Sequence, residues 1–189
     1  TPLNAVIGFA EILEMDSGAL SEVHKESVGH IYDAGTHLLA LINEVLDLAS
    51  IDAGKMKLSM TAVMLDKSFD ECRVIATQLA ASGGINVQFG SAKNIIVKAD
   101  AVRLRQALLN FISNAIKYNR KGGYVWVDCY ELGGNRVRVN VKDSGPGLTS
   151  EQSARLFQPF ERLGREAGDV QGSGIGLVIT KKLIESMGG

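Results

Sequence analysis

The sequence is poor in several features that mark particular protein classes. Its 189 residues include two cysteines, Cys72 and Cys129, and three prolines. Two cysteines are too few for a disulfide framework and fit a reducing compartment. The 20 basic and 21 acidic residues leave a formal net charge of −1. This balance gives no electrostatic reason to expect a nucleic-acid partner.

Long apolar runs are also missing. No uninterrupted stretch reaches the roughly 18 apolar residues of a membrane span, and no signal peptide opens the chain. The sequence therefore predicts no membrane segment within these residues. We expect a cytoplasmic location, whether or not the whole protein is anchored in a membrane. The length allows one or two domains, and no internal repeat is present.

The first informative segment is LRQALLNFISNAIKYN, residues 104–119, which combines apolar residues at helical spacing with an unusual polar face. At helical periodicity that face carries Arg103, Gln106, Asn110, Asn114 and Lys117. An asparagine oxygen is a hard neutral ligand that suits Mg²⁺, and a lysine one turn further on can meet phosphates. Taken alone, the same pattern also fits the solvated face of an ordinary amphipathic helix.

Two glycine-rich stretches follow this segment. The first, DSGPGL at residues 143–148, ends an alternating strand-like run, and its aspartate could accept a hydrogen bond from the amine of adenine. Taken alone, it is equally an aspartate-initiated turn. The second, GSGIGL at residues 172–177, follows a polar segment that we interpret as a mobile loop, residues 162–171.

Glycines that open a helix expose free backbone amides to a phosphate chain, and LVITKKLIESM after GSGIG has the apolar pattern of a packed helix. A simple helix-entry loop is the alternative. The chain contains no GxxxxGK[ST] motif, and GSGIG differs from the dinucleotide-binding GxGxxG.

Together these motifs resemble the ATP-binding domain of the sensor histidine kinases, which belong to a wider group with gyrase, chaperone and mismatch-repair ATPases. NFISNAIKYN, residues 110–119, resembles the family's asparagine box. DSGPGL and GSGIGL resemble its two glycine boxes, and LFQPFERLG, residues 156–164, resembles its phenylalanine box. Four motifs in this order make the resemblance specific, and it covers essentially the whole chain.

The resemblance implies a role for each matching residue. Asn114 would coordinate Mg²⁺, with Asn110 in support, and Lys117 and Tyr118 would contact the phosphates and the nucleotide. Asp143 would recognise adenine beside Gly145 and Gly147, and Phe157 and Phe160 would anchor a lid. The residues expected along the phosphates are Gly172, Ser173, Gly174, Ile175, Gly176 and Leu177.

The front of the chain carries two helix-like runs, residues 1–13 and 21–53, separated by a short turn. Two such helices cannot bury both apolar faces alone, whereas two chains together form a four-helix bundle. TPLN followed by a hairpin resembles the dimerisation and phosphoacceptor domain of the same kinases. Their acceptor is the histidine of HELRTPLN, which falls before Thr1.

For Thr1 the resemblance implies a part in the reverse, phosphatase reaction. His24, His30 and His37 lack the context of the acceptor motif, and we interpret them as surface or bundle histidines.

The predicted fold is therefore α+β. Residues 1–55 form an antiparallel helical hairpin, half of a dimeric four-helix bundle, and residues 56–189 form a two-layer α/β sandwich. In the second part we expect a helix over residues 67–81, the striped helix capped by Asp100, and a hairpin turning at Gly133-Gly134-Asn135. Strands are expected over residues 57–65, 85–89, 94–99, 124–132 and 136–143. The family continues beyond this point with further strands, so we expect the chain to be part of a longer protein.

The function implied is that of a histidine kinase catalytic core. It would pass the γ-phosphoryl group of Mg²⁺-ATP to a histidine, and from there to an aspartate on a response-regulator receiver domain. Two alternatives stay open from the sequence: a related ATPase that moves domains, and a dimeric scaffold that senses ATP without transferring phosphate.

Overall fold

The computed structural model describes residues 2–15, 18, 20–161 and 173–189. The chain divides into two compact units, Thr1–Gly54 and Lys55–Gly189. The boundary predicted from the sequence lay one residue later. Three features expected from the sequence fall outside the described residues, namely Thr1, Gly172 and the polar loop at residues 162–171.

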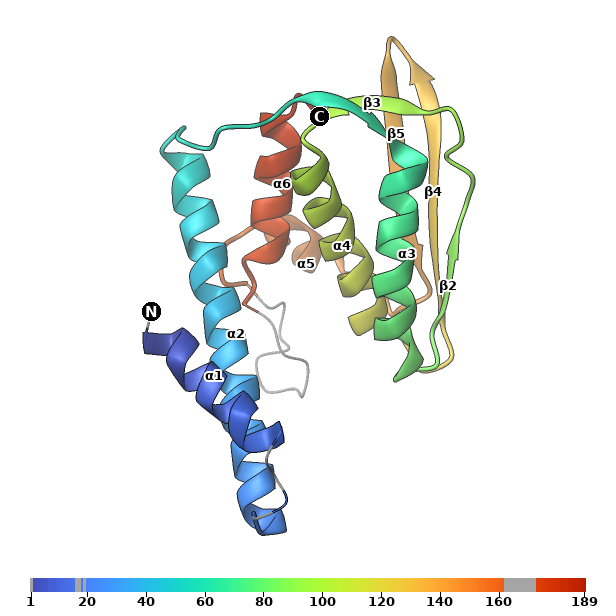
Figure 1. Cartoon of the computed structure of the whole chain (residues 1–189). Coiled ribbons are helices and arrows are strands. Elements are labelled where there is room, and N and C mark those ends of the chain that lie inside the picture. The colour runs from blue at the N-terminus through green and yellow to red at the C-terminus, as the bar shows by residue number, and fades with distance from the viewer. Residues whose placement is uncertain (1, 16–17, 19, 162–172) are drawn as a thin grey trace. The chain divides into compact units, whose positions relative to one another are not determined.

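The first unit is a pair of helices, α1 (Pro2–Met15) and α2 (Glu22–Asp52) (Figure 1). Ser21 caps α2, because its side chain accepts a hydrogen bond from the backbone amide of His24. The two helices approach closely at Gly35, where an added Cβ would lie 2.9 Å from Cγ1 of Ile7. The predicted hairpin is confirmed.

Most apolar side chains of this hairpin are not buried within it. Phe9 is 68% exposed and Leu46 is 58% exposed, and only Ala10, Val28 and Gly35 are buried among the described residues of the two helices. By length and composition alone, α2 is also apolar enough to cross a membrane, although the sequence analysis expected no such segment.

The second unit packs helices against strands. Its elements, in chain order, are β1 (Thr61–Met64), α3 (Leu65–Ala81), β2 (Asn86–Phe89), β3 (Ile96–Ala99), α4 (Ala101–Lys117), β4 (Tyr124–Gly133), β5 (Arg136–Asp143), α5 (Ser150–Arg155) and α6 (Gly176–Ser186). Helix α4 packs against α3 and α6 and against β4 and β5, so it occupies the middle of the helical layer (Figure 1).

The strands of the predicted α/β sandwich form two sheets. Strands β1 and β3 pair antiparallel, while β4 pairs parallel with β2 and antiparallel with β5. The hairpin between β4 and β5 turns at Gly133, Gly134 and Asn135, all with positive φ. On its other side, β5 pairs with no strand among the described residues.

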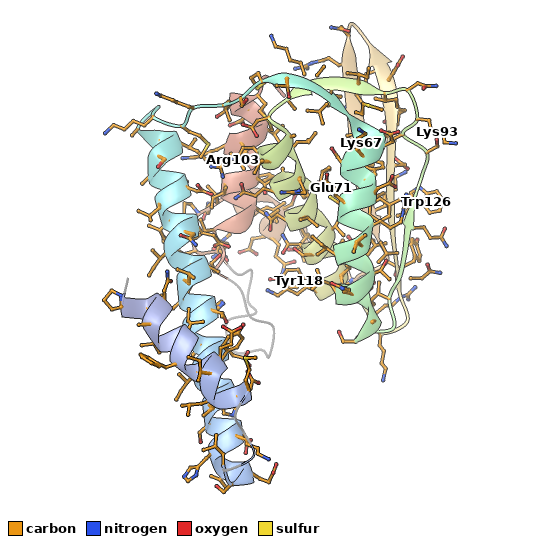
Figure 2. All side chains as sticks on the ribbon, viewed as in Figure 1. Lys67, Glu71, Lys93, Arg103, Tyr118 and Trp126 are labelled. Atoms are coloured by element: carbon orange, nitrogen blue, oxygen red, sulfur yellow. The ribbon has the colours of Figure 1, made fainter. Side chains whose placement is uncertain are left out.

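The core lies between the helices and the sheets, and it fixes the rotation of α4. Leu108 and Ile112 are buried on its inner face, against Val125 and Val127 of β4 and Phe69 of α3. The polar stripe of α4 consequently lies away from this core. Figure 2 shows Tyr118 at the carboxyl end of α4 and Trp126 on the strand side of this unit.

Two local elements differ from the sequence-based expectation. The first strand is short, and α3 already begins at Leu65, whose side chain is fully buried in the core. Helix α5 was not predicted. Its start carries a capping box, in which Thr149 and Gln152 exchange side-chain to backbone hydrogen bonds. The spacing Thr-x-x-Gln was a signal that could have identified this helix.

Candidate functional site

Helix α4 carries most of the candidate site, and Asp100 fixes its first turn. One carboxylate oxygen of Asp100 accepts hydrogen bonds from the amides of Val102 (3.0 Å) and Arg103 (3.2 Å). The other accepts from the amide of Ser59 (2.9 Å). These hydrogen bonds, that from Ser59 above all, hold the pKa of the Asp100 carboxyl below its ordinary value. The predicted cap is confirmed.

The two asparagines of the stripe contact each other. Asn114 Nδ2 donates to Asn110 Oδ1 at 3.4 Å, and Asn110 Nδ2 lies 2.6 Å from Oγ1 of Thr180 on α6. Within the described parts of the chain, the oxygen of Asn114 accepts no hydrogen bond. A half-buried amide oxygen with unused acceptor capacity fits a hard cation such as Mg²⁺.

The second glycine stretch meets this asparagine pair from the start of α6. An added Cβ at Gly176 would lie 2.8 Å from Oδ1 of Asn110, and one at Gly174 would lie 2.8 Å from the carbonyl carbon of Phe160. Gly174 also has a φ of +72°. Both positions therefore need glycine, and the first amides of an 11-residue helix lie beside the asparagines.

The carboxyl end of α4 forms a second part of the site. Lys117 Nζ lies 5.2 Å from the ring centre of Tyr118, which ends the helix. A cavity of about 430 Å³ opens here. It is lined by Lys117, Tyr118, Asn119, Arg120, Ser144, Gly145 and Pro146. Of these, Asn119, Arg120, Ser144 and Pro146 were not among the residues predicted to bind ATP.

Asp143 lies beside this cavity at the end of β5. One of its carboxylate oxygens accepts a hydrogen bond from the amide of Gly145 at 2.8 Å. A Cβ at Gly145 would lie 2.7 Å from that oxygen and 2.9 Å from the carbonyl oxygen of Tyr118, and Gly147 has a φ of +72°. The exposed carboxylate thus keeps a second oxygen with which it can accept a further hydrogen bond.

Hydrogen bonds connect the turn of the first glycine stretch to the carboxyl end of α4. Ser144 Oγ donates to Asn119 Oδ1 at 3.0 Å and accepts from the amide of Tyr124 at 2.9 Å. Asn119 Nδ2 donates to the carbonyl of Tyr124 at 2.9 Å. The serine and the last asparagine of the box therefore set the position of Asp143, a role that the motif sequence alone did not reveal.

The phenylalanine box follows α5 and approaches α6. Lys181 Nζ lies 5.1 Å from the ring centre of Phe157, and Arg155 pairs with Glu161 at 2.5 Å. Phe160 is 68% exposed, and its backbone has a positive φ of 64°. Anchoring of a lid by Phe157 and Phe160 stays a prediction.

The structure thus brings Asn110, Asn114 and Gly176 together at the middle of α4, and Lys117, Tyr118, Asp143 and Gly145 at its end. Gly174 lies against the backbone of Phe160 and Glu161 instead. An oxygen ligand, a cation, free helix amides and a carboxylate acceptor are the groups that a nucleotide phosphate chain and an adenine base would need. In the described parts of the molecule, no cluster of His, Cys, Asp and Glu could hold a metal ion.

Known protein families match the two units of the chain separately, and the first match ends at the boundary between the units. Residues 1–54 match the His Kinase A (phospho-acceptor) domain, and residues 99–189 match the histidine kinase-, DNA gyrase B- and HSP90-like ATPase family. The first match includes all of α2, the helix that is apolar enough to cross a membrane.

Individual relatives agree with both matches. The circadian input-output histidine kinase CikA of Synechococcus elongatus is 36% identical over 197 residues, which cover 100% of this chain and 26% of CikA. A crystal structure of full-length ShkA in complex with AMPPNP has a TM-score of 0.82 and 34% identity, over 99% of this chain and 38% of ShkA. A structure of ThkA in complex with the response regulator TrrA shares the fold, with a TM-score of 0.61 and 23% identity over 87% of this chain and 48% of that one.

Proposed function

Because this chain belongs to the sensor histidine kinase family, we propose that its whole protein binds Mg²⁺-ATP and transfers the γ-phosphoryl group to a histidine. The chain carries the two domains of a histidine kinase catalytic core. The observation that supports the proposal most strongly is the meeting of Asn110 and Asn114 with Gly176 at the start of α6. This arrangement supports a site in which an oxygen ligand for the metal would lie beside the first amides of α6.

The residues act mainly by positioning and by neutralising charge, as is general for phosphoryl transfer. Asn114 would hold Mg²⁺ through its side-chain oxygen, and the bound ion would neutralise charge on the phosphates. Lys117 would bring a second positive charge to the phosphates from the end of α4. Asp143 would accept a hydrogen bond from the adenine amine, which guanine lacks at that position.

The protein's assembly and partners form part of the proposal. The exposed apolar side chains of α1 and α2 support a homodimer in which two hairpins form a four-helix bundle. By analogy with ThkA, which binds the response regulator TrrA, the acceptor would pass its phosphoryl group to a receiver domain. Since ATP and such regulators are intracellular, the catalytic part would be cytoplasmic. Thr1 would assist the reverse, phosphatase reaction.

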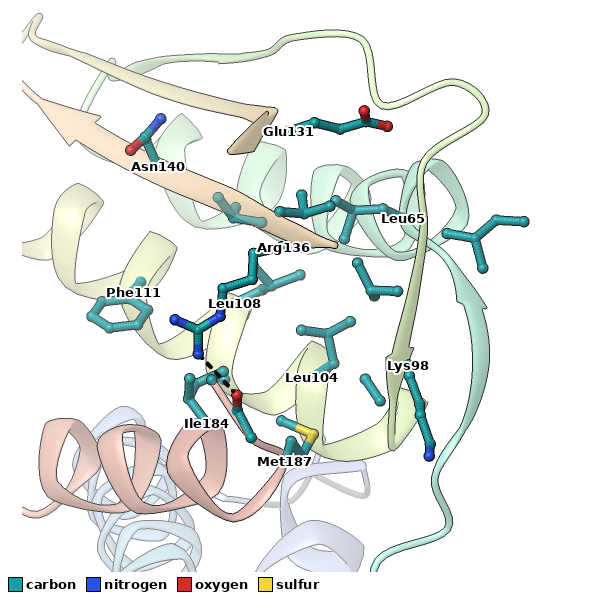
Figure 3. A pocket seen from close by; sticks show the side chains of 18 of the residues that line it. Leu65, Lys98, Leu104, Leu108, Phe111, Glu131, Arg136, Asn140, Ile184 and Met187 are labelled. Carbon is teal, nitrogen blue, oxygen red and sulfur yellow. Dashed lines mark hydrogen bonds between the residues drawn. The ribbon is translucent and has the colours of Figure 1, made fainter. Parts of the chain in front are cut away.

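The three-stranded sheet β2-β4-β5 supports a further proposal about the whole domain. A cleft of about 970 Å³ lies beside β5, at the edge where this strand pairs with no other strand in the described part of the chain, and it extends to β3, α4 and the end of α6 (Figure 3). Apolar side chains of Leu108, Phe111, Val139 and Met187 line it, and Arg136 bridges it to the carbonyl of Gly188 at 3.3 Å. We propose that additional strands of the whole protein pair with β5 and cover this cleft.

The test is incubation with ATP labelled on its γ-phosphate, followed by gel analysis under alkaline conditions. Histidine phosphate is labile in acid and survives base. The full-length protein should become labelled, whereas the 189-residue chain should bind ATP without becoming stably labelled. Asn114→Ala, which removes the oxygen ligand, and Asn114→Asp, which adds a charge beside the phosphates, should both abolish labelling of the full-length protein while leaving it folded.

Each other outcome selects a different function. Base-stable, acid-labile label on His24, His30 or His37 of the 189-residue chain would overturn the assignment of the acceptor. Tight ATP binding with no label on either protein would favour the ATP-sensing scaffold. Steady release of phosphate without labelled protein would favour an ATPase. Full labelling of Asn114→Ala at matched Mg²⁺ would remove Asn114 from the metal site.

A further inference from the structure

Thr180 is a polar residue in an otherwise apolar part of α6. It is 2% exposed, and it follows Val178 and Ile179, which are also buried. Valine has nearly the same shape as threonine, so packing alone does not require a hydroxyl here. That hydroxyl lies 2.6 Å from Nδ2 of Asn110 on α4. A buried hydroxyl is costly unless it is hydrogen-bonded, and Asn110 supplies the partner.

In this hydrogen bond the Asn110 amide is the donor, so its nitrogen is held toward Thr180. The oxygen and the nitrogen of an amide point in different directions from the same carbon. Since the nitrogen of Asn110 faces Thr180, its oxygen faces Asn114, whose own Nδ2 donates to it at 3.4 Å. The nitrogen of Asn114 is thereby directed toward Asn110, and its oxygen is left for a ligand. Thr180, Asn110 and Asn114 thus form a chain of oriented groups across two helices.

Loss of the hydroxyl would leave the nitrogen of Asn110 without the acceptor that it has on α6. The amide could then turn by half a rotation and direct its nitrogen toward Asn114. Asn114 would respond by directing its oxygen to Asn110 and its nitrogen to the metal position. An amide nitrogen is not a ligand for Mg²⁺, which takes oxygen ligands.

We propose that Thr180 is a positioning residue for Mg²⁺: through Asn110 it orients the side chain of Asn114 so that the amide oxygen faces the ion. This inference rests on the proposed function, because it assumes that Asn114 is the metal ligand. It assigns to α6 a second task beyond presenting the amides of its first turn.

The test compares Thr180→Val, which keeps the shape and removes the hydroxyl, with Thr180→Ser, which keeps the hydroxyl and removes a methyl group. For each protein, calorimetry gives the Kd of AMPPNP with Mg²⁺ and with EDTA, and the ratio of the two measures the contribution of the metal. We expect Thr180→Val to reduce this ratio by about fivefold, the equivalent of one hydrogen bond. Thr180→Ser should keep the ratio of the parent.

Thermal unfolding separates positioning from packing. Valine keeps the packing of Thr180 but loses the hydrogen bond to Asn110, and serine keeps that bond but leaves a cavity, so both variants should lower the Tm modestly. We therefore expect stability and the response to Mg²⁺ to separate, because both variants lose some stability but only Thr180→Val loses the contribution of the metal. In an Asn114→Ala background, Thr180→Val should change the ratio no further.

The outcomes separate this inference from the proposed function. If the parent and Thr180→Val show the same ratio, the positioning role is overturned while the metal site stands. If the parent binds AMPPNP equally with Mg²⁺ and with EDTA, the proposed metal site itself fails and the inference fails with it. If Thr180→Ser loses the metal contribution as fully as Thr180→Val, packing rather than the hydroxyl is responsible.

Discussion

Gly176 and Asn110 lie so close that a Cβ on residue 176 would be 2.8 Å from the Asn110 side-chain oxygen. The backbone at the start of α6 therefore rests directly on the side chain of α4. This contact explains why the asparagine stripe of α4 requires a glycine at position 176 of the second glycine stretch. A larger residue there would displace the amide that Asn114 contacts.

Gly176→Ala should therefore weaken nucleotide binding. The added methyl group forces Asn110 to move, and we expect the Kd of Mg²⁺-AMPPNP to rise about tenfold, the equivalent of roughly 1.4 kcal/mol. Overall stability should change little, because alanine forms helices better than glycine by about 1 kcal/mol and offsets the strain.

Gly29→Ala in α2 is the matched control for this variant, since nothing lies within 4 Å of the added Cβ. It should leave the Kd unchanged and raise the thermal stability of the hairpin. Unchanged affinity in Gly176→Ala would show that the close approach to Asn110 has no part in binding.

Asp100 should stabilise the second unit in a pH-dependent way. Asp100→Ala removes both the cap of α4 and the acceptor for the Ser59 amide, and should cost about 1–2 kcal/mol of unfolding free energy at pH 7. Asp100→Asn keeps an oxygen for the cap and turns an amino group toward Ser59, and should cost less. Urea denaturation measures both.

The direction of the pH effect follows from the lowered pKa of Asp100 in the folded protein. Its stabilising contribution is present above the unfolded value of about 3.9 and is lost as the pH falls through the folded value. The difference between parent and Asp100→Asn should therefore shrink below about pH 4. Asp70→Asn, which alters an exposed carboxylate paired with Arg73, should change stability by less than about 0.5 kcal/mol at either pH. A pH-independent cost in Asp100→Asn would exclude a role for the charge.

The apolar surface of the hairpin should mediate self-association. Leu46 is 58% exposed in α2, and Leu46→Lys should convert a dimer to a monomer in sedimentation equilibrium at micromolar concentration. Val74 in α3 offers a matched control, because it is 64% exposed and belongs to the other unit. Val74→Lys should leave the dimer intact. A parent that is monomeric at every concentration would refute the four-helix bundle.

Much of this architecture could be predicted because its signals are local. Each of these signals depends only on residues that are close together in the sequence. They are the apolar spacing of α4, its cap at Asp100 and the glycine turn between β4 and β5. The asparagine face followed from the same periodicity, and the family resemblance supplied the roles of its residues.

The features that were not predicted depend on contacts between distant residues. The bond between Asn110 and Thr180 joins positions 70 residues apart, and nothing in the local pattern of α6 distinguishes Thr180 from a packing residue. The separation of β1 and β3 from the other strands likewise depends on pairing partners, which the alternation of single strands does not specify. Only the capping box of α5 was a local signal that we did not use.

Asp143 should determine which nucleotide is bound. Asp143→Asn can keep an oxygen for the amide of Gly145, but it puts an amino group where the adenine amine needs an acceptor. The change should cost about 1–3 kcal/mol of ATP binding free energy. Asp128→Asn is the control, because Asp128 lies on β4 and its carboxylate is already bonded to Asn140 at 2.5 Å and Lys142 at 3.0 Å. It should leave ATP affinity unchanged.

The central claim is that the asparagine stripe of α4 and the two glycine stretches form one site for Mg²⁺-ATP. Titration calorimetry of ATP and GTP into the unmodified chain, each with Mg²⁺, tests it most directly. We expect measurable binding of ATP, no measurable binding of GTP, and loss of the ATP signal in Asn114→Ala. Equal affinity for ATP and GTP, or ATP binding that is indifferent to Asn114→Ala, would contradict it.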